Sequence, residues 1–493
     1  MKKMSQKPEN ENSTSVADSY IVHSLASIRK TYRHTYHAMP PVGWMNDPNG
    51  FCYAFGKYQL FFQFYPYGAA WNSMHWGHYA SQDFVRWQLL PTALAPNGKA
   101  DRDGCFSGSA IVKDGKLYLM YTSVLGGKQT LSLAVSSDGV RFDKIGEVIP
   151  GELLPPHCAR SDFRDPKVFV RKGMYYVLTG SLSTEGEGQI LLFRSPDLMQ
   201  WEYVNTVRRD RLTTRGIYEC PDFFEYGGKD VILCSPQGYE TDDWRYENLH
   251  SSIYMVGKLN VASGTFDKEY EDEIDGGFDF YAPQTTRTPD GRIVMIAWMQ
   301  MWSRTMPTAQ HGWAGSMTLP RELSLKDGKL LQRPVREIEN YRRNHVSYSD
   351  VALTQTVRLD NVKGVKTELD FTLDLGTAKR VGIRLFENSR HSACVYYDRT
   401  LDRVIFDRSK MGVEIACDVK ERDAAVRSVK VDVSENRISM RIFLDVSSCE
   451  VFLNGGERTM TGNVYSDGSG ISFFAEDGEA RLVRLDKYDI VVE

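Results

Sequence analysis

The chain has 493 residues, which is more than one hydrophobic core usually organises, so two domains are expected. Its composition, 42% hydrophobic and 25% charged, is that of an ordinary globular protein. A net charge of −4 does not favour a nucleic-acid partner, and no apolar run approaches the ~18 residues of a membrane span. Neither a nucleic acid nor a membrane is therefore an expected partner.

Residues 1–33 are predicted to form an N-terminal helical extension. Apolar residues recur at spacings of three and four between Val16 and Ile28, which is the helical period. The polar start of the chain lacks the apolar core of a secretory signal, and none of the eight cysteines forms a C-x-x-C pair. These features predict a cytoplasmic protein with reduced thiols and no metal site.

Residues 34–332 are predicted to form a five-bladed β-propeller. Short alternating strands follow five Gly-centred turns, at positions 56, 115, 173, 228 and 291. A second pattern, S-x-D-x-x-x-aromatic, recurs in phase at 81–87, 136–142 and 195–201. Hairpin repeats longer than about 50 residues are typical of propeller blades. The alternative, an irregular β-sandwich, would require both patterns to coincide by chance.

Residues 333–344 are charged and are predicted to be a linker, and residues 345–493 are predicted to form a β-sandwich. Alternating strands are expected at 367–373, 380–386 and 437–446, with Gly-, Asp- and Asn-rich turns. The expected role of this domain is support or contact in a homo-oligomer, a state that the sequence leaves open. The predicted fold class is therefore all-β, a five-bladed propeller followed by a C-terminal sandwich.

Three carboxylates stand at the same phase of the repeat. Asp47, Asp165 and Glu219 each precede a turn glycine by eight or nine residues, where Ser107 and Ala282 stand in the other two blades. The first strand of a blade lines the central channel, so these carboxylates should converge. Either Asp alone could belong to an ordinary Asp-Pro turn. Crowded carboxylates repel one another, whereas glycoside hydrolysis requires such a group and a raised pKa on its acid.

Several motifs resemble glycoside hydrolase family 32, which comprises invertases, sucrose-6-phosphate hydrolases and fructanases. The resemblance rests on residues 44–50 (WMNDPNG), 163–166 (FRDP), 218–222 (YECPD) and 312–323 (GWAGSMTLPREL). It covers the chain from about residue 33 and implies the same two-domain plan.

The resemblance implies a retaining β-fructofuranosidase. Asp47 would be the nucleophile, Glu219 the acid/base and Asp165 the stabiliser of the transition state, with no cofactor and no metal. Arg164 would orient the carboxylates, or else form a structural ion pair. The implied substrate-binding residues are Asn46, Gln63, Trp71, Phe106, Ser107, Arg164 and Trp302, although each aromatic could instead pack the channel wall.

The expected substrate is sucrose 6-phosphate, sucrose or both, cleaved to fructose and glucose 6-phosphate or glucose. Arg245, Arg304 and His311 are expected on rim loops and are candidate phosphate contacts. Alternatives are a fructan hydrolase or fructosyltransferase with the same triad, and a sugar-binding propeller without activity.

Overall fold

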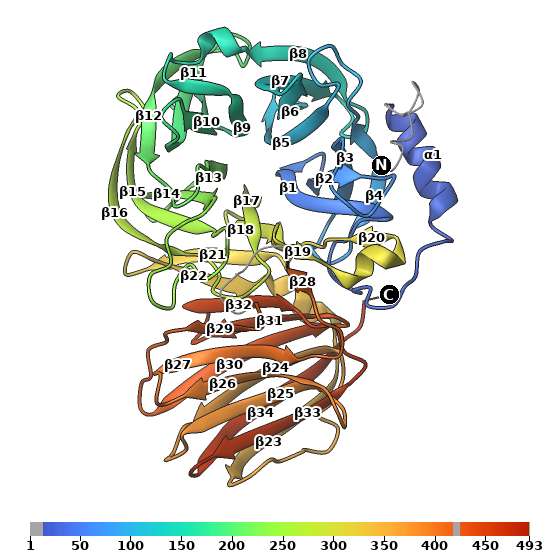
Figure 1. Cartoon of the computed structure of the whole chain (residues 1–493), viewed down its shortest axis with the longest axis vertical. Coiled ribbons are helices and arrows are strands. Elements are labelled where there is room, and N and C mark those ends of the chain that lie inside the picture. Colours follow the sequence, from blue (N-terminus) through green and yellow to red (C-terminus); the bar gives the residue numbers. More distant parts are fainter. Residues whose placement is uncertain (1–12, 418–423, 493) are drawn as a thin grey trace, which may run out of the picture.

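The computed structural model describes residues 13–417 and 424–492, and it is nearly all-β, as predicted. Figure 1 shows several sheets arranged around a ring, with two further sheets stacked beneath the ring. An α-helix, α1 (Thr14–Ser24), lies beside the first sheet. In the described part of the chain, no helix is both long and apolar enough to cross a membrane.

Five sheets make up the ring. One of them has five strands and the other four have four strands each, and most neighbouring strands of a sheet are also consecutive along the chain. The first sheet is β1 (Gly43–Ala54), β2 (Lys57–Tyr65), β3 (His75–Ser81) and β4 (Gln88–Leu94), joined by β20 (Trp313–Ala314). The second is β5 (Gly104–Lys113), β6 (Lys116–Leu125), β7 (Lys128–Ser136) and β8 (Asp143–Ile149). The third is β9 (Cys158–Arg171), β10 (Met174–Ser183), β11 (Gly188–Ser195) and β12 (Glu202–Asp210). The fourth is β13 (Tyr218–Tyr226), β14 (Lys229–Pro236), β15 (Ile253–Asn260) and β16 (Thr265–Glu273), and the fifth is β17 (Tyr281–Arg287), β18 (Ile293–Trp298), β21 (Arg321–Lys326) and β22 (Lys329–Pro334).

Two larger sheets pack face to face beneath the ring (Figure 1). One contains, in spatial order, β23 (Arg342–Leu353), β34 (Ala480–Ile490), β24 (Lys366–Asp374), β30 (Arg437–Asp445), β31 (Ser448–Leu453) and β32 (Arg458–Asn463). The other contains β29 (Val426–Val429), β27 (Arg403–Lys410), β26 (Ser392–Asp398), β25 (Arg380–Glu387) and β33 (Gly470–Glu476). The three strands expected here from the sequence coincide with β24, β25 and β30 to within one residue at each end.

The ring is held together by an apolar cluster between each pair of neighbouring sheets. Phe61 of the first sheet packs with Leu119 of the second, and equivalent clusters follow between each later pair. The last cluster joins Ile296 of the fifth sheet to Phe64 of the first. Strand β20 also pairs with β1, so the chain closes the ring with both hydrogen bonds and buried apolar surface.

The two sequence repeats are structural repeats. All five turn glycines have positive φ between the first and second strand of a sheet. In the second pattern, Asp138 Oδ1 accepts hydrogen bonds from the backbone N–H groups of Val140 and Arg141, and from Ser136 Oγ. Asp83 and Asp197 make the same contacts in the first and third sheets, so the pattern forms the turn before the fourth strand.

Two predicted segments differ from the structure. The N-terminal helix ends at Ser24 instead of continuing toward residue 33. Beyond it, the Arg29 N–H donates to the His311 carbonyl oxygen at 3.0 Å, so the chain lies against the segment around His311. Residues 1–12 of the predicted extension lie outside the described residues. The predicted linker, 333–344, is structured: the 3₁₀-helix η3 (Arg336–Tyr341) buries Ile338 and Tyr341 against the larger sheet.

Two other 3₁₀-helices are η1 (Gly151–Leu153) and η2 (Pro307–His311), and β19 (Arg304–Thr305) pairs with β28 (Ala416–Cys417).

Candidate active site

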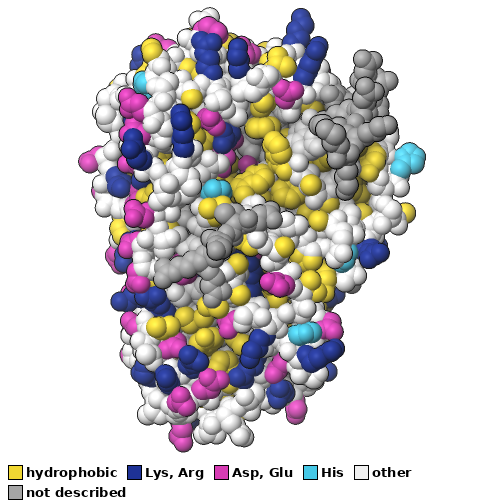
Figure 2. Space-filling view, in the orientation of Figure 1, with side chains coloured by type: hydrophobic (Ala, Val, Ile, Leu, Met, Phe, Trp, Pro, Cys, Tyr) yellow, Lys and Arg dark blue, Asp and Glu magenta, His cyan; other side chains and the backbone are white. Residues whose placement is uncertain are grey.

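A cavity of about 390 Å³ lies where the inner strands of the ring meet, and every predicted catalytic and sugar-binding residue lines it. It is lined by Asn46, Asp47, Gln63, Trp71, Phe106, Ser107, Arg164, Asp165, Glu219 and Trp302, together with Gln129, Asp162, Gln237 and His250. On the face viewed in Figure 2, hydrophobic side chains gather toward the centre of the ring. The first strand of each sheet lies toward this centre (Figure 1), as the channel prediction requires.

Each inner strand has an irregularity at its site residues. Pairing is interrupted between Met45 and Pro48 in β1, and in β9 and β13 it breaks beside Asp165 and Glu219. Pro48, Pro166 and Pro221 stand in these breaks or directly after them. Proline has no backbone N–H to donate to a neighbouring strand, so it is tolerated at a bulge. Asp165 and its neighbour in the next sheet, Cys220, have positive φ. Bulges bend the strands and direct these side chains into the cavity.

Asp47 is 7% exposed and is held by neutral donors. Ser107 Oγ donates to its Oδ2 at 2.6 Å, Asn46 Nδ2 donates to its Oδ1 at 3.1 Å, and Cys220 Sγ lies 3.5 Å from Oδ2. Burial raises the pKa of Asp47, and the bond from Ser107 opposes that rise. No cation is paired with Asp47 among the described contacts, so its lone pairs stay available to attack an electrophile.

Glu219 is held by charged and polar donors on both oxygens. Arg164 donates to Oε1 through Nη2 at 2.8 Å and through Nε at 3.1 Å. Tyr281 donates its hydroxyl to Oε2 at 2.6 Å. Burial alone would raise the pKa of Glu219, but Arg164 and Tyr281 outweigh it and hold the pKa below its usual range. The free structure therefore favours the carboxylate form of Glu219.

Asp165 is the carboxylate of the cavity whose pKa is raised close to neutral. Burial raises the pKa of Asp165 to about 7 against the attraction of Arg164, and the charges of Glu219 and Asp47 add to the rise. The Cys220 N–H donates to its Oδ2 at 3.1 Å, which fixes the carboxyl in the cavity. The sequence predicted one raised pKa and placed it on the acid, Glu219. In the structure the raised pKa lies on Asp165 instead, because Arg164 contacts Glu219 more closely than Asp165, which lies 3.9 Å away.

Five further residues belong to this site and were not predicted. Asp162 lies on the same face of β9 as Arg164, which is readable from strand alternation, and it accepts from Arg164 at 3.2 Å. Tyr281 stands directly before Ala282, the residue at the shared phase in the fifth sheet, and its hydroxyl donates to Glu219. Gln129, Gln237 and His250 line the cavity from positions that the repeat does not mark, so only the folded structure identifies them.

The three predicted phosphate contacts do not line the cavity of the carboxylates. Arg304 is 3% exposed and pairs with Asp279 at 2.9 Å, beneath the ring. Arg245 pairs with Asp242 and with Asp272, and it lines a different cavity. His311 stacks on Tyr32. Each of the three is thus engaged with neighbours other than Asp47, Asp165 and Glu219.

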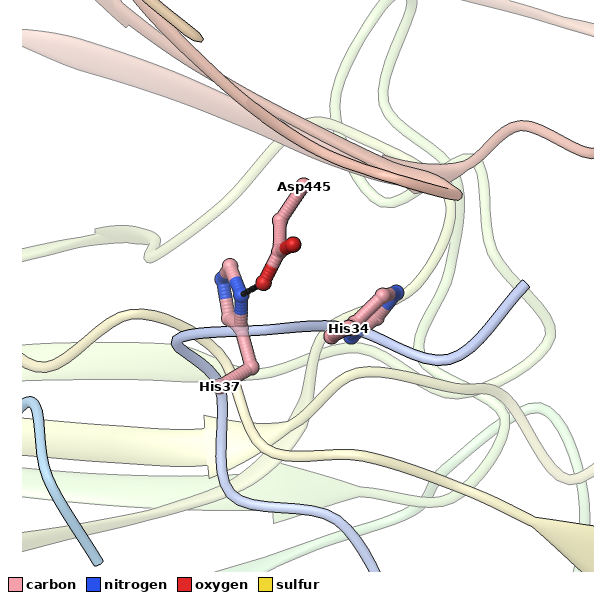
Figure 3. A group of neighbouring side chains, drawn as sticks. All are labelled: His34, His37 and Asp445. Carbon is pink, nitrogen blue, oxygen red and sulfur yellow. Dashed lines mark hydrogen bonds and ion pairs between the residues drawn. The ribbon is translucent and has the colours of Figure 1, made fainter. Parts of the chain in front are cut away.

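His34, His37 and Asp445 form the one group in the described residues with the spacing of metal ligands (Figure 3). His37 Nδ1 contacts Asp445 at 2.8 Å and its Nε2 contacts Glu450 at 2.9 Å. Both ring nitrogens are therefore directed at carboxylates, which suits an imidazolium and leaves no lone pair for a cation. We interpret the group as an ion-paired cluster between the N-terminal segment and the lower sheets.

Comparison with known proteins gives matches over nearly the whole chain. The model of the glycosyl hydrolases family 32 N-terminal domain matches residues 37–334, and that of the family's C-terminal part matches residues 337–489. The raffinose invertase of Escherichia coli is 38% identical over 484 residues, which are 95% of this chain and 97% of the relative. The sucrose-6-phosphate hydrolase of Escherichia coli is 36% identical over 469 residues, 92% of this chain and 94% of the relative.

Solved structures agree with these matches. The β-fructofuranosidase of Bombyx mori has a TM-score of 0.84 and 34% identity, with 98% of this chain and 99% of that chain covered. A variant of the same silkworm enzyme has been solved in complex with sucrose.

Proposed function

The chain belongs to glycoside hydrolase family 32, and from that premise we propose that it is a retaining β-fructofuranosidase in which Asp47, Glu219 and Asp165 perform the chemistry. It is a glycoside hydrolase that acts on sucrose or sucrose 6-phosphate, in keeping with its relatives. The observation that carries the proposed mechanism is the convergence of three carboxylates, from three separate sheets, in one cavity of about 390 Å³.

In the proposed reaction, Asp47 attacks C2 of the fructosyl unit and the bond to the leaving oxygen breaks. Glu219 passes the proton that the coupled carboxylates share to this oxygen, and a fructosyl-enzyme remains. Glu219 then removes a proton from water, which releases fructose and restores Asp47. The contacts from Arg164 and Tyr281 favour ionised Glu219, which is the form that the second step requires.

Asp165 would interact with the fructose ring, where negative charge stabilises a developing oxocarbenium ion. The three carboxylates interact strongly, so their protons belong to the group and not to one residue. The neutral contacts of the fructose pocket would come from Asn46, Gln63, Trp71, Phe106 and Ser107, and Trp302 would lie toward the leaving group.

The proposed architecture is a five-bladed propeller over residues 34–332 and a β-sandwich over residues 345–493. Support comes from the five apolar clusters between neighbouring ring sheets and from one continuous core in the lower pair of sheets. The proposed location is the cytoplasm, a reducing compartment that suits eight free cysteines.

The test uses fructose release from sucrose by Asp47→Asn and Glu219→Gln proteins. Each substitution should lower kcat by about 10³-fold or more, because a reacting group is lost. With p-nitrophenyl β-fructofuranoside, whose leaving group needs no proton, Glu219→Gln should recover fructosyl transfer and Asp47→Asn should not. The exposed Asp267→Asn on β16 is the matched control and should keep full activity. Undiminished hydrolysis by Asp47→Asn would refute the mechanism.

A further inference from the structure

The geometry points to Tyr20 of helix α1 as a positioning residue for sugar binding, which acts through Tyr67 on the loop 66–74 that carries Trp71. The inference rests on the proposed function and deepens it, because it gives a role in substrate affinity to a helix that lies beside the ring of sheets (Figure 1). Tyr20 is not among the described residues that line the cavity of the carboxylates, so its effect on the sugar is indirect.

Trp71 lines the cavity from a loop and is only partly packed. Its side chain is 47% exposed, and its ring meets that of Phe106 edge-on, with the centroids 5.6 Å apart. The other lining tryptophan, Trp302, instead packs against Trp44 and Trp298, with centroids 6.1 Å and 4.9 Å away. A half-exposed ring is held less by its surroundings than a packed one, so the position of Trp71 follows the backbone of its loop.

Tyr67 fixes the start of this loop through three ring contacts. Its ring lies edge-on to the rings of Tyr20 at 5.0 Å, Tyr65 at 5.6 Å and His75 at 5.8 Å. Tyr65 is the last residue of β2 and His75 is the first of β3, so both belong to the same hairpin as the loop. Of these three rings, that of Tyr20 comes from another element, and it therefore limits the movement of the loop relative to the sheet.

Helix α1 is itself held against the first sheet, which gives Tyr20 a fixed position. Asp18 Oδ1 accepts hydrogen bonds from the Thr92 N–H at 2.9 Å and from Thr92 Oγ1 at 2.7 Å. Ile21 is buried in the apolar cluster that joins the fifth sheet to the first. Asp18 and Ile21 flank Tyr20 in the sequence, so the ring that contacts Tyr67 stands on a docked backbone.

The arrangement predicts an effect on affinity and not on the chemical steps. Asp47 is held by Ser107. Glu219 is held by Arg164 and Tyr281. These contacts come from the inner strands of the second, third and fifth sheets, so they do not depend on the hairpin loop. A looser loop therefore weakens the binding of substrate and transition state alike, which raises KM and leaves kcat unchanged.

The experiment measures kcat and KM for sucrose with the full chain and its variants. Tyr20→Ala should raise KM by about 3- to 10-fold and keep kcat within about twofold of the wild type, because an edge-on ring contact is lost. Tyr20→Phe keeps the ring and should keep the wild-type KM. Tyr32→Ala is the matched control: this ring follows in the same N-terminal segment but contacts His311 and Tyr465, so KM should not change.

A double-mutant cycle tests whether the effect passes through Trp71. Trp71→Ala should raise KM at least as much as Tyr20→Ala, and adding Tyr20→Ala to it should cause no further rise. A loss of folded protein lowers the apparent kcat and leaves KM unchanged, so it is distinguished from the expected effect. An unchanged KM in Tyr20→Ala, an equal rise in Tyr32→Ala, or a further rise in the double variant would overturn the inference. Absence of cleavage by the wild-type protein would instead refute the proposed function.

Discussion

At the scale of single residues, Arg164 sets the ionisation of the site. It contacts Glu219 with two nitrogens and lies 3.9 Å from Asp165, so one guanidinium opposes the mutual repulsion of two buried carboxylates. Because Arg164 lies closer to Glu219, the pKa of Glu219 falls below its usual range, while that of Asp165 rises to about 7. The distribution of charge therefore follows the closest distances from Arg164 to its two neighbours, 2.8 Å to Glu219 and 3.9 Å to Asp165.

Arg164→Gln should shift the pH profile of kcat/KM on sucrose to higher pH. The guanidinium lowers the pKa of both Glu219 and Asp165, so its removal raises both and moves the alkaline limb upward by about one unit. We also expect kcat to fall by about 10²-fold, because the carboxylates lose their orienting partner. Arg160→Gln, on the same strand and 3.6 Å from Glu152, is the control. An unshifted profile would contradict this role of Arg164.

Asp165→Asn should make the protein inactive but more thermostable at alkaline pH. Folding raises the pKa of Asp165 from 3.8 to about 7, so the native state loses stability as pH rises from about 4 through 7. The asparagine variant lacks this loss. Its Tm should therefore exceed that of the wild type at pH 8, and the two should agree near pH 4. A lower Tm at pH 8 would show that contacts of the carboxylate, such as that from Cys220, outweigh its repulsion.

At the scale of elements, two recurring features of the ring sheets have different roles: the bulges of the inner strands and the S-x-D turns before the outer strands. Bulges in the inner strands direct side chains such as Glu219 into the cavity, at a cost in regular pairing. The S-x-D turns between the third and fourth strands lie away from the cavity and stabilise the outer part of each sheet. The same repeat thus carries function at its inner edge and stability at its outer edge.

Asp138→Ala tests the contribution of an S-x-D turn to stability. The change removes the acceptor of two backbone N–H groups in the turn before β8, so we expect a loss of roughly 1 kcal/mol and a fall of Tm of about 1–2 °C. Activity on sucrose should not change, because the turn is remote from the lining residues. Asp143→Ala, exposed at the start of β8, is the matched control and should leave Tm unaltered. Equal effects of the two variants would show that the turn contributes nothing specific.

At the scale of the whole molecule, a buried charged network joins the ring to the lower sheets. Arg321 of the fifth sheet pairs with Asp275 at 3.0 Å and with Glu450 at 2.7 Å. His37 lies between Glu450 and Asp445 of the sheet below. Burial lowers the pKa of His37, but hydrogen bonds to both carboxylates raise it to about 9. The network therefore fixes the two parts together while His37 stays protonated.

His37→Gln should lower stability at pH 7 by about 3–5 kcal/mol, because it leaves buried carboxylates without their cation. The raised pKa means that the contribution of His37 is complete below about pH 6.5 and is lost as pH rises through 9. The Tm difference from wild type should thus shrink at pH 10. His345→Gln, which breaks an exposed pair with Asp486, should change stability by at most about 1 kcal/mol. A pH-independent difference would contradict the assigned charge.

The sequence by itself determined the β class of the protein and the repeat that places its three carboxylates. Turn glycines and the S-x-D pattern recur along the chain, and local hydrogen bonds suffice to fold them, so the β class and the phase of Asp47, Asp165 and Glu219 could be read directly. The family motifs then supplied the remaining predicted lining residues, each of which lies in the cavity.

Only the tertiary structure decided which groups meet across sheets. The lowered pKa of Glu219, the burial of Arg304, the ordered segment at 336–341 and the positions of Gln237 and His250 all arise from contacts between residues far apart in sequence. Such contacts leave no local period, because burial and charge proximity depend on the packing of the closed ring and the sheets beneath it.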